Sequence, residues 1–448
     1  MERKIFFILL FMFLMIYGQP SNKEAIPYKC GVDSDQTFSE FSYVTPIKNS
    51  KFHIDERRLD NDGFKNFSIY LDTYNLEEEM KYYNLSQYSN LFISSMKKAI
   101  ETLESLLKVK ETGCYYFKDE DMKDIDIHYW DKTKIGTEAF NNSITTCSNN
   151  IDLFIFARFG KGNELSNLTL AKAGAKYLDF ETGRPIIGLV NINRNVDYSK
   201  INSKEYFQSI IIHEFTHILG FSGYFFTNFY HNAFTTIDKF NITRTYINST
   251  KVVETARKYF NCPDLEGVEL EDSGGSGTTG SHWEARILLG DYMNGVIYPE
   301  EQVISEFTLA LLEDSGYYKA NYYTGGLMRY GKNKGCKFVK DKCVNNYEVD
   351  PYFENEFYDF FSSTQSISPS CSSGRQSRTY FAVFIKKSIP IYYQYYWNSS
   401  YGGFDSADYC PVPREFQNNN RYYVGHCSNK GNGEYGDKIK YIEDNHYK

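Results

Sequence analysis

Apolar and polar positions alternate along the chain from about residue 67, and this pattern predicts where its ordered elements begin. The run 67–72, Phe-Ser-Ile-Tyr-Leu-Asp, alternates in the manner of a half-buried strand. Four apolar residues then recur at helical spacing: Met96, Ile100, Leu103 and Leu107. Three more strands are predicted, at residues 125–129, 151–157 and 186–192. Strands interspersed with helices predict an α+β fold for this part of the chain.

A helix predicted over residues 203–219 is the most distinctive segment. Asn202 and Glu205 have the spacing of a capping box at its start, and Gly220 ends it. Apolar residues surround the whole helix, so we expect it to lie buried between other elements. The histidines and the glutamate inside it are therefore unusual, because buried imidazoles and carboxylates are costly unless they are paired or metal-bound.

These polar residues form the motif His213-Glu-Phe-Thr-His217. Two imidazoles four residues apart share one helix face, where both can reach one tetrahedral zinc ion. Glu214 lies beside them and can act as the general base that deprotonates a water activated by the metal. The motif thus predicts a hydrolytic zinc site with Zn²⁺ as its one catalytic ion.

A hydrolytic zinc site needs a third protein ligand. The metzincin pattern H-E-x-x-H-x-x-G-x-x-H is met as far as Gly220, but Gly223 stands where the third His is expected. A carboxylate ligand in a thermolysin-like scheme is the alternative. Four downstream residues are candidates: His231, His282, Glu254 and Glu266.

His282 lies in the run Gly280-Ser-His-Trp-Glu-Ala-Arg286 and is followed by Met293 in Asp-Tyr-Met-Asn-Gly295. With these motifs the sequence resembles the leishmanolysin family of metzincin peptidases, in which an insertion separates the helix motif from a third His in a Ser-His-Trp context. The resemblance implies that His282 is the third ligand and that Met293 forms the methionine turn beneath the metal. Tyr292 is better interpreted as a packed side chain than as an oxyanion-stabilising group.

The resemblance extends over most of residues 66–345. It includes Ala173-Gly174, the run 184–188 and the run 307–318, although Tyr317 stands where the family usually has Trp. It implies a zincin/metzincin-like catalytic domain with a mixed sheet and an active-site helix. The cysteines from Cys336 onwards and the short predicted strands indicate a disulfide-rich, mostly β or irregular C-terminal domain after it. A helix at 306–314, capped by Gly316, and a short strand at 380–385 are predicted within residues 306–448.

Before residue 66 the sequence has features of an exported protein. Arg3 and Lys4 precede an apolar run that ends at Gly18, which is the layout of a signal peptide. We expect five segments: a signal peptide at 1–18, a pro-segment at 19–65, an N-terminal catalytic subdomain with the zinc helix at 66–220, a central subdomain with the third His and the Met-turn at 221–320, and a Cys-rich C-terminal domain at 321–448.

Export is also indicated by glycosylation triplets and cysteines. Seven Asn-x-Ser/Thr sites occur: Asn66, Asn84, Asn141, Asn167, Asn241, Asn248 and Asn398. The nine cysteines fit disulfides better than cytosolic thiols, and their odd number leaves one over. Cys30 is the best candidate, because Lys29-Cys-Gly-Val-Asp33 resembles the cysteine-switch motif of matrix metallopeptidase pro-segments.

Net charge and hydropathy exclude other classes of partner. A net charge of -8 and the absence of a basic cluster argue against nucleic acid. The apolar run at the start is too short to span a membrane, and the end of the chain carries no hydrophobic tail of the kind that signals a lipid anchor. We therefore expect no stable membrane insertion, and a monomer that is secreted, lies in the lumen of a secretory or digestive vesicle, or sits at the cell surface.

The sequence therefore predicts a zinc endopeptidase that hydrolyses proteins or peptides. The alternative is a catalytically silent surface or adhesion glycoprotein that keeps the metzincin fold, which the intact Glu214 disfavours.

Overall fold

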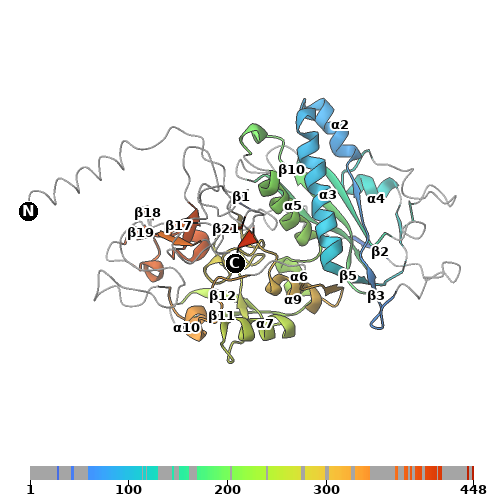
Figure 1. The fold of residues 1–448 in the computed structure, drawn as a ribbon. Coiled ribbons are helices and arrows are strands. Elements are labelled where there is room, and N and C mark those ends of the chain that lie inside the picture. Colours follow the sequence, from blue (N-terminus) through green and yellow to red (C-terminus); the bar gives the residue numbers. More distant parts are fainter. Residues whose placement is uncertain are drawn as a thin grey trace, which may run out of the picture.

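The computed structural model describes residues 59–343 almost continuously and shorter segments on either side (Figure 1). The gaps inside 59–343 are 114, 118, 130–143, 146–150, 161–168, 202–203, 239–240, 274–277, 298–301 and 324–327. Outside that range the described segments are 28–29, 42–44, 369–371, 378–381, 384–385, 389–395, 399–410, 412–415, 441–442 and 446–447.

A five-stranded sheet with the order β2-β9-β10-β8-β4 is the framework of the N-terminal half. Its strands are β2 (Ser42–Val44), β4 (Ile69–Asp72), β8 (Leu153–Phe159), β9 (Ala171–Asp179) and β10 (Pro185–Ile192). The strands β4, β8 and β10 run parallel, β9 is antiparallel to β10, and β2 is parallel to β9. Both faces of β8 and β10 are buried, which explains why their sequences are continuous apolar runs.

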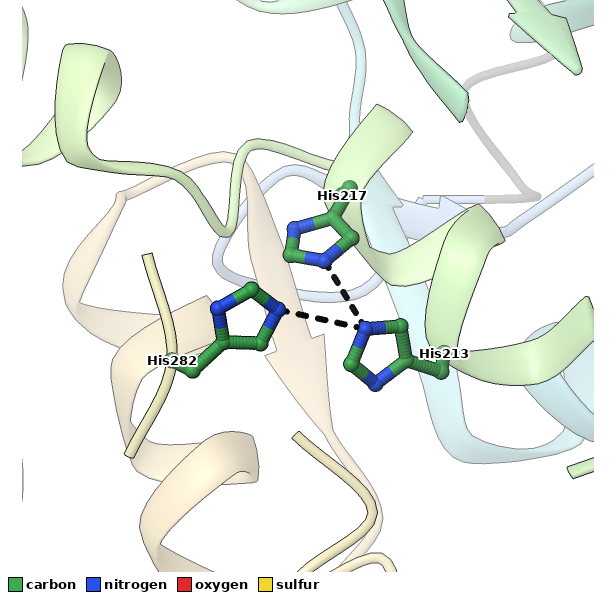
Figure 2. Close-up of side chains that lie close together, drawn as sticks. All are labelled: His213, His217 and His282. Carbon is green, nitrogen blue, oxygen red and sulfur yellow. Dashed lines mark hydrogen bonds between the residues drawn. The ribbon is translucent and has the colours of Figure 1, made fainter. Parts of the chain in front are cut away.

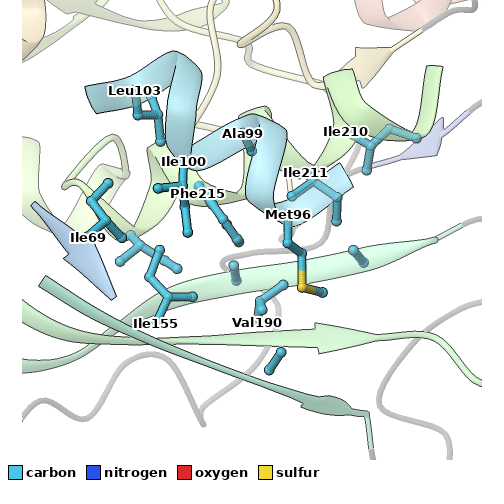
Figure 3. Close-up of a cluster of buried hydrophobic side chains, with 14 of the residues drawn as sticks. Ile69, Met96, Ala99, Ile100, Leu103, Ile155, Val190, Ile210, Ile211 and Phe215 are labelled. Carbon is cyan, nitrogen blue, oxygen red and sulfur yellow. The ribbon is translucent and has the colours of Figure 1, made fainter. Parts of the chain in front are cut away.

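The helices α3 (Ser89–Leu106) and α5 (Lys204–Ile218) pack side by side on one face of this sheet (Figure 3). Ile155 and Val190 project from the strands towards Phe215 of α5. The opposite face is covered by aromatic and aliphatic residues around α4 (Asp119–Asp124), including Phe117 and Met122. The sheet therefore supports α5 along the length that carries the His213-Glu-Phe-Thr-His217 motif.

The remaining elements of this half are short. They are β3 (Phe64–Asn66), α2 (Tyr74–Tyr82), η4 (Ser86–Tyr88), β5 (Leu107–Lys110), β6 (Tyr116–Phe117), β7 (Ile144–Thr145) and η5 (Tyr198–Lys200). The strand predicted at 125–129 is wrong. Asp126 has a left-handed φ of 62°, and the amide of Ile127 donates to the carbonyl of Met122, so the chain turns there. Ile125 and Ile127 alternate with polar residues because they are buried against the sheet.

A second group of elements follows α5. It comprises α6 (Gly223–Asn228), β11 (Ala233–Ile237), β12 (Thr243–Ile247), α7 (Thr250–Phe260), β13 (Val268–Glu269), α8 (Ala285–Leu288), β14 (Val296–Ile297), α9 (Glu306–Asp314), β15 (Tyr318–Ala320) and α10 (Cys336–Lys340). The predicted helix at 306–314 is confirmed. Its start is capped by Ser305, whose Oγ accepts from the amides of Phe307 and Thr308, and Gly316 has a φ of 76° after its end.

Trp283 and Met293 lie in a second hydrophobic core, which also contains residues from α7 and α9. Cys343 and Cys410 belong to the same core, so segments beyond residue 340 pack on the central region. Two disulfides are described, Cys262–Cys336 and Cys343–Cys410. The first joins the end of α7 to α10.

The described C-terminal elements are short strands and turns: β16 (Pro369–Cys371), β17 (Arg378–Phe381), β18 (Phe384–Ile385), η6 (Ile391–Tyr393), β19 (Tyr401–Gly402), η7 (Asp405–Ala407), β20 (Pro413–Glu415), β21 (Tyr441–Ile442) and β22 (His446–Tyr447). The single strand predicted at 380–385 is divided between β17 and β18. The α+β class is confirmed, and among the described residues no helix combines the length and apolar character needed to cross a membrane.

Candidate metal centre

The end of α5 positions the second histidine of the motif. The amide of Phe221 donates to the carbonyl of Thr216 and the amide of Gly220 donates to that of His217, which is the Schellman arrangement. Gly220 has a φ of 106°, a conformation that favours glycine. This turn brings the carbonyl of Phe221 to 2.6 Å from Nδ1 of His217. The same turn therefore ends the helix and orients the imidazole.

Backbone carbonyls orient the other two imidazoles in the same way. Nδ1 of His213 lies 2.6 Å from the carbonyl oxygen of Tyr292, and Nδ1 of His282 lies 2.8 Å from that of Thr278. A carbonyl can only accept, so each Nδ1 must carry the proton. Each Nε2 then carries no proton, and its lone pair can bind a metal ion.

The three Nε2 atoms converge on one point (Figure 2). His217 Nε2 lies 3.0 Å from His213 Nε2, and His282 Nε2 lies 3.3 Å from it. With all protons on Nδ1, lone pairs face one another and repel unless a cation lies between them. A tetrahedral zinc ion with Zn–N bonds of about 2.0–2.1 Å sets nitrogens about 3.3 Å apart, so the donor set fits zinc in type and in spacing.

His282 follows an inserted segment that begins at Gly223. Gly223 is the position where the metzincin pattern has its third His. The amide of Gly223 donates to Oγ of Ser281 at 2.8 Å, so the chain returns to the place it left. A side chain at Gly223 would meet the carbonyl oxygen of Gly280 at 3.1 Å. The insertion thus delivers an imidazole to the site that a residue at 223 would otherwise occupy.

The segment 291–295 contacts both His213 and the segment that carries His282. Oδ1 of Asp291 accepts from the amide of Met293 at 2.6 Å, and Asp291 is itself held by Ser305 and Thr308. The carbonyl of Met293 accepts from the amide of Trp283, next to His282. Met293 is fully buried. One tight turn therefore connects the residue that holds His213 to the segment that carries His282.

Glu214 follows His213 in α5, is buried, and contacts the main sheet. Its Oε2 accepts from the amide of Ala173 in β9 at 2.6 Å. Burial raises the pKa of Glu214 well above its usual value, and the Ala173 amide opposes this. A cation held by the neighbouring nitrogens would favour the ionised carboxylate again.

Burial also keeps the imidazoles neutral, which is the form that binds metal. It lowers the pKa of His213 and His217 well below the usual value, and the neighbouring imidazoles act in the same direction. Burial lowers the pKa of His282 to about 4.

The other candidate ligands lie elsewhere. His231, Glu254 and Glu266 are exposed, and among the described residues His282 is the one that clusters with His213 and His217. Tyr292 is buried, and its hydroxyl is paired with Oγ1 of Thr216 at 2.9 Å. Its carbonyl orients His213, a backbone role that the sequence analysis did not identify.

Other predicted sites are only partly described. Four of the glycosylation candidates are exposed: Asn66, Asn84, Asn241 and Asn248. The remaining three, Asn141, Asn167 and Asn398, lie outside the described residues, as do Cys30 and the signal peptide at 1–18.

Sequence reasoning also missed the roles of three further residues that shape the site. Asp291 precedes the methionine turn at the spacing of an Asx-turn, a signal that could have been used. Ala173 donates a backbone amide, which no side-chain pattern reveals. At Gly295 an added Cβ would lie 2.1 Å from Cγ2 of Thr278 and 3.5 Å from Cγ of His282. Gly295 thus makes room for the loop that orients His282.

Comparison with known proteins shows which family this chain resembles. A family profile described as leishmanolysin matches residues 88–432. The chain is 36% identical over 243 residues to a leishmanolysin homolog from Crithidia fasciculata, covering 52% of this chain and 34% of that protein. It is 31% identical over 245 residues to leishmanolysin from Leishmania tropica, covering 52% and 34%. It is 32% identical over 212 residues to a leishmanolysin-like peptidase from Caenorhabditis briggsae, covering 42% and 31%. The matches thus span about a third of each relative's length.

Proposed function

The chain belongs to the leishmanolysin family of zinc metallopeptidases, and on this basis we propose that it is a secreted zinc-dependent endopeptidase. His213, His217 and His282 hold one zinc ion, and Glu214 is the general base. The observation that carries the proposal is the convergence of three Nε2 atoms, because those of His217 and His282 lie 3.0 and 3.3 Å from that of His213. The adjacent residue in the helix, Glu214, is a buried carboxylate.

Zinc in this position supplies a Lewis acid that polarises a scissile carbonyl and lowers the pKa of water to about 7. Glu214 takes a proton from the attacking water and delivers it to the leaving amine. The Ala173 amide fixes one carboxylate oxygen, so Glu214 keeps one orientation through both transfers. Met293 packs beneath the site, because a thioether is apolar and a poor competitor for zinc beside three imidazoles.

The test is hydrolysis of casein or gelatin by the purified protein. Cleavage should stop when zinc is removed with 1,10-phenanthroline and return when zinc is added back. Zinc-loaded, fully processed protein without cleavage would favour the alternative, a surface or adhesion glycoprotein that keeps the fold without catalysis.

Gly295→Ala should weaken zinc binding about 10- to 100-fold, the range seen when groups that orient a metal ligand are disturbed. The added methyl displaces Thr278, whose carbonyl orients His282. Zinc affinity is measured by competition with a chromogenic chelator. The double variant Gly295→Ala/Thr278→Ser removes the clashing Cγ2 and should recover most of the affinity. An unchanged affinity in Gly295→Ala would contradict this account of how His282 is held.

Two short strands before residue 66 pair with β14 and β9, elements of the region that carries the proposed zinc site. The strand β1 (Tyr28–Lys29) is antiparallel to β14, which begins directly after Gly295. The strand β2 pairs with residues 177–179 of β9, the strand that carries Ala173 nearer its start. This placement supports the proposal that residues 19–65 form a pro-segment that keeps the enzyme latent.

Cys30 directly follows β1 in the sequence, and its thiolate could fill the open zinc position, because zinc binds sulfur well and lowers its pKa. We expect unprocessed wild-type protein to be inactive, and mercurial reagents or cleavage between about residues 31 and 65 to activate it. Unprocessed Cys30→Ser should be active at once, as measured by peptide hydrolysis. Equal activity of the two unprocessed forms would rule out a cysteine switch.

A further inference from the structure

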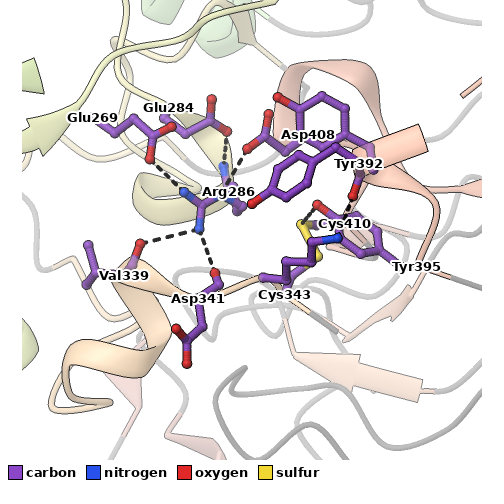
Figure 4. The surroundings of a disulfide bond; sticks show 12 residues. Glu269, Glu284, Arg286, Val339, Asp341, Cys343, Tyr392, Tyr395, Asp408 and Cys410 are labelled. Atoms are coloured by element: carbon purple, nitrogen blue, oxygen red, sulfur yellow. Dashed lines mark hydrogen bonds and ion pairs between the residues drawn. A yellow bond between two sulfur atoms is a disulfide. The ribbon is translucent and has the colours of Figure 1, made fainter. Parts of the chain in front are cut away.

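A cluster of carboxylates, all buried except the partly buried Asp272, lies next to the segment that carries His282, and the proposed peptidase chemistry does not use it. Glu271, Asp272 and Glu284 each offer an oxygen, and these three atoms lie within 4.8 Å of one another. Asp408 lies close by, because Glu269, Glu284 and Asp408 form a second group at the same spacing. Figure 4 shows Glu269, Glu284 and Asp408 gathered around Arg286.

The arginines of this region neutralise only part of the acidic charge. Arg244 pairs with Glu269 and, at 3.0 Å, with Asp408. Arg286 pairs with the same two carboxylates at 2.6 and 3.1 Å. The pairs occupy Glu269 and one oxygen of Asp408. Glu271 and Glu284 have no ion pair to either arginine within 4 Å. Asp272 makes one long ion pair, to Arg244 at 3.5 Å.

Three carboxylate oxygens of the cluster accept no hydrogen bond from any described residue. They are Glu271 Oε2, Glu284 Oε2 and Asp408 Oδ1, and all three residues are at most 1% exposed. The second oxygen of Glu271 accepts from Ser273, and that of Glu284 accepts from the amide of Arg286. Each carboxylate is thus oriented through one oxygen, while the other remains without a donor. A buried carboxylate oxygen without a hydrogen-bond donor lowers the stability of the folded protein, and a bound cation offsets this loss.

We propose that Glu271, Asp272 and Glu284 form a second metal site, which binds a hard divalent cation of the Ca²⁺ type. The donors are all oxygens, which disfavours zinc and copper. Ca²⁺ takes several carboxylates at about 2.3–2.6 Å in flexible geometry, so ligand oxygens up to about 5 Å apart can share one ion. Mg²⁺ fits less well, because it retains several waters and requires octahedral geometry.

The backbone connects this site to the zinc centre. The amide of Glu271 donates to the carbonyl of His282 at 2.9 Å, and the amide of Glu284 donates to the carbonyl of Glu269 at 3.1 Å. The segments 269–271 and 282–284 therefore form a short ladder. A cation bound by Glu271 and Glu284 joins both sides of this ladder and braces the segment that carries His282.

Binding can be measured directly on the whole protein with Tb³⁺, which replaces Ca²⁺ in oxygen sites. Tyr393 Oη lies 3.3 Å from Oδ2 of Asp272, so excitation of this tyrosine should sensitise a bound Tb³⁺. We expect a saturable luminescence signal that Ca²⁺ displaces and equal Mg²⁺ does not. Calcium at about 100 times its dissociation constant should raise the unfolding temperature by about 3 °C over magnesium.

Asp272→Asn and Glu271→Gln should lose the Tb³⁺ signal and the calcium-dependent stabilisation. Asp238→Asn is the matched control, because Asp238 also pairs with Arg244, at 3.3 Å, but lies outside the cluster. His213→Ala should keep calcium binding, which separates this site from the proposed zinc function. The proposal is overturned if calcium and magnesium give wild-type protein the same unfolding temperature and no Tb³⁺ binds, or if both cluster variants bind Tb³⁺ like wild type. The wild-type measurements decide the question even where a variant fails to fold.

Discussion

Glu214→Gln is expected to lower kcat/KM for a peptide substrate by roughly 10²–10⁴-fold, the contribution typical of a general base. The glutamine carbonyl can still accept from the Ala173 amide, so the side chain should keep its position. It cannot take a proton from water at neutral pH. Zinc content and unfolding temperature should therefore stay at the wild-type values, and Glu214→Ala should show the same loss of activity.

The matched control is Glu205→Gln, the same chemical change at an exposed position in the first turn of α5. This variant should cleave casein like wild type. Undiminished turnover by Glu214→Gln would contradict the general-base role. A loss of zinc in that variant would mean that the carboxylate maintains the site instead of performing catalysis.

His282→Ala should lose both zinc and peptidase activity. A three-imidazole site reduced to two cannot hold zinc in the arrangement of a hydrolytic centre. Loss of a group that only orients a ligand lowers metal affinity about 10- to 100-fold, and we expect the zinc affinity of His282→Ala to fall further than this. Zinc content after gel filtration and casein cleavage measure the two effects.

His231→Ala and Glu254→Ala are the controls for the third ligand. Both residues are exposed and lie outside the cluster around His213, so neither change should alter zinc content or activity. Normal zinc binding by His282→Ala together with zinc loss in Glu254→Ala would favour a thermolysin-like site, with a carboxylate as the third ligand, over the three-histidine site.

The elements that sequence reasoning predicted well are those whose apolar pattern is strong and local. The strands β8 and β10 are continuous apolar runs because both faces are buried, and α9 has a cap at each end. The strand β9 was not predicted, because its alanines and glycine carry little hydrophobic signal. Its conformation depends on pairing with β10 along almost its whole length. The strand expected at 125–129 is absent for the opposite reason. Alternating apolar and polar residues show which side chains are buried, but they do not by themselves pair the segment with another strand.

For the candidate site, the sequence by itself determined the residues that one helix can bring together. Positions 213, 214 and 217 have a fixed relation in any α-helix, so their shared face follows from the helical repeat. The tertiary structure alone decided how the third imidazole arrives, since His282 is 69 positions from His213 and only folding of the insertion brings it within 3.3 Å. It also decided which groups orient the imidazoles, because all three are backbone carbonyls that any residue type could supply. The buried carboxylates beside His282 became apparent in the same way, because acidic residues scattered in sequence form a cluster only after the chain has folded.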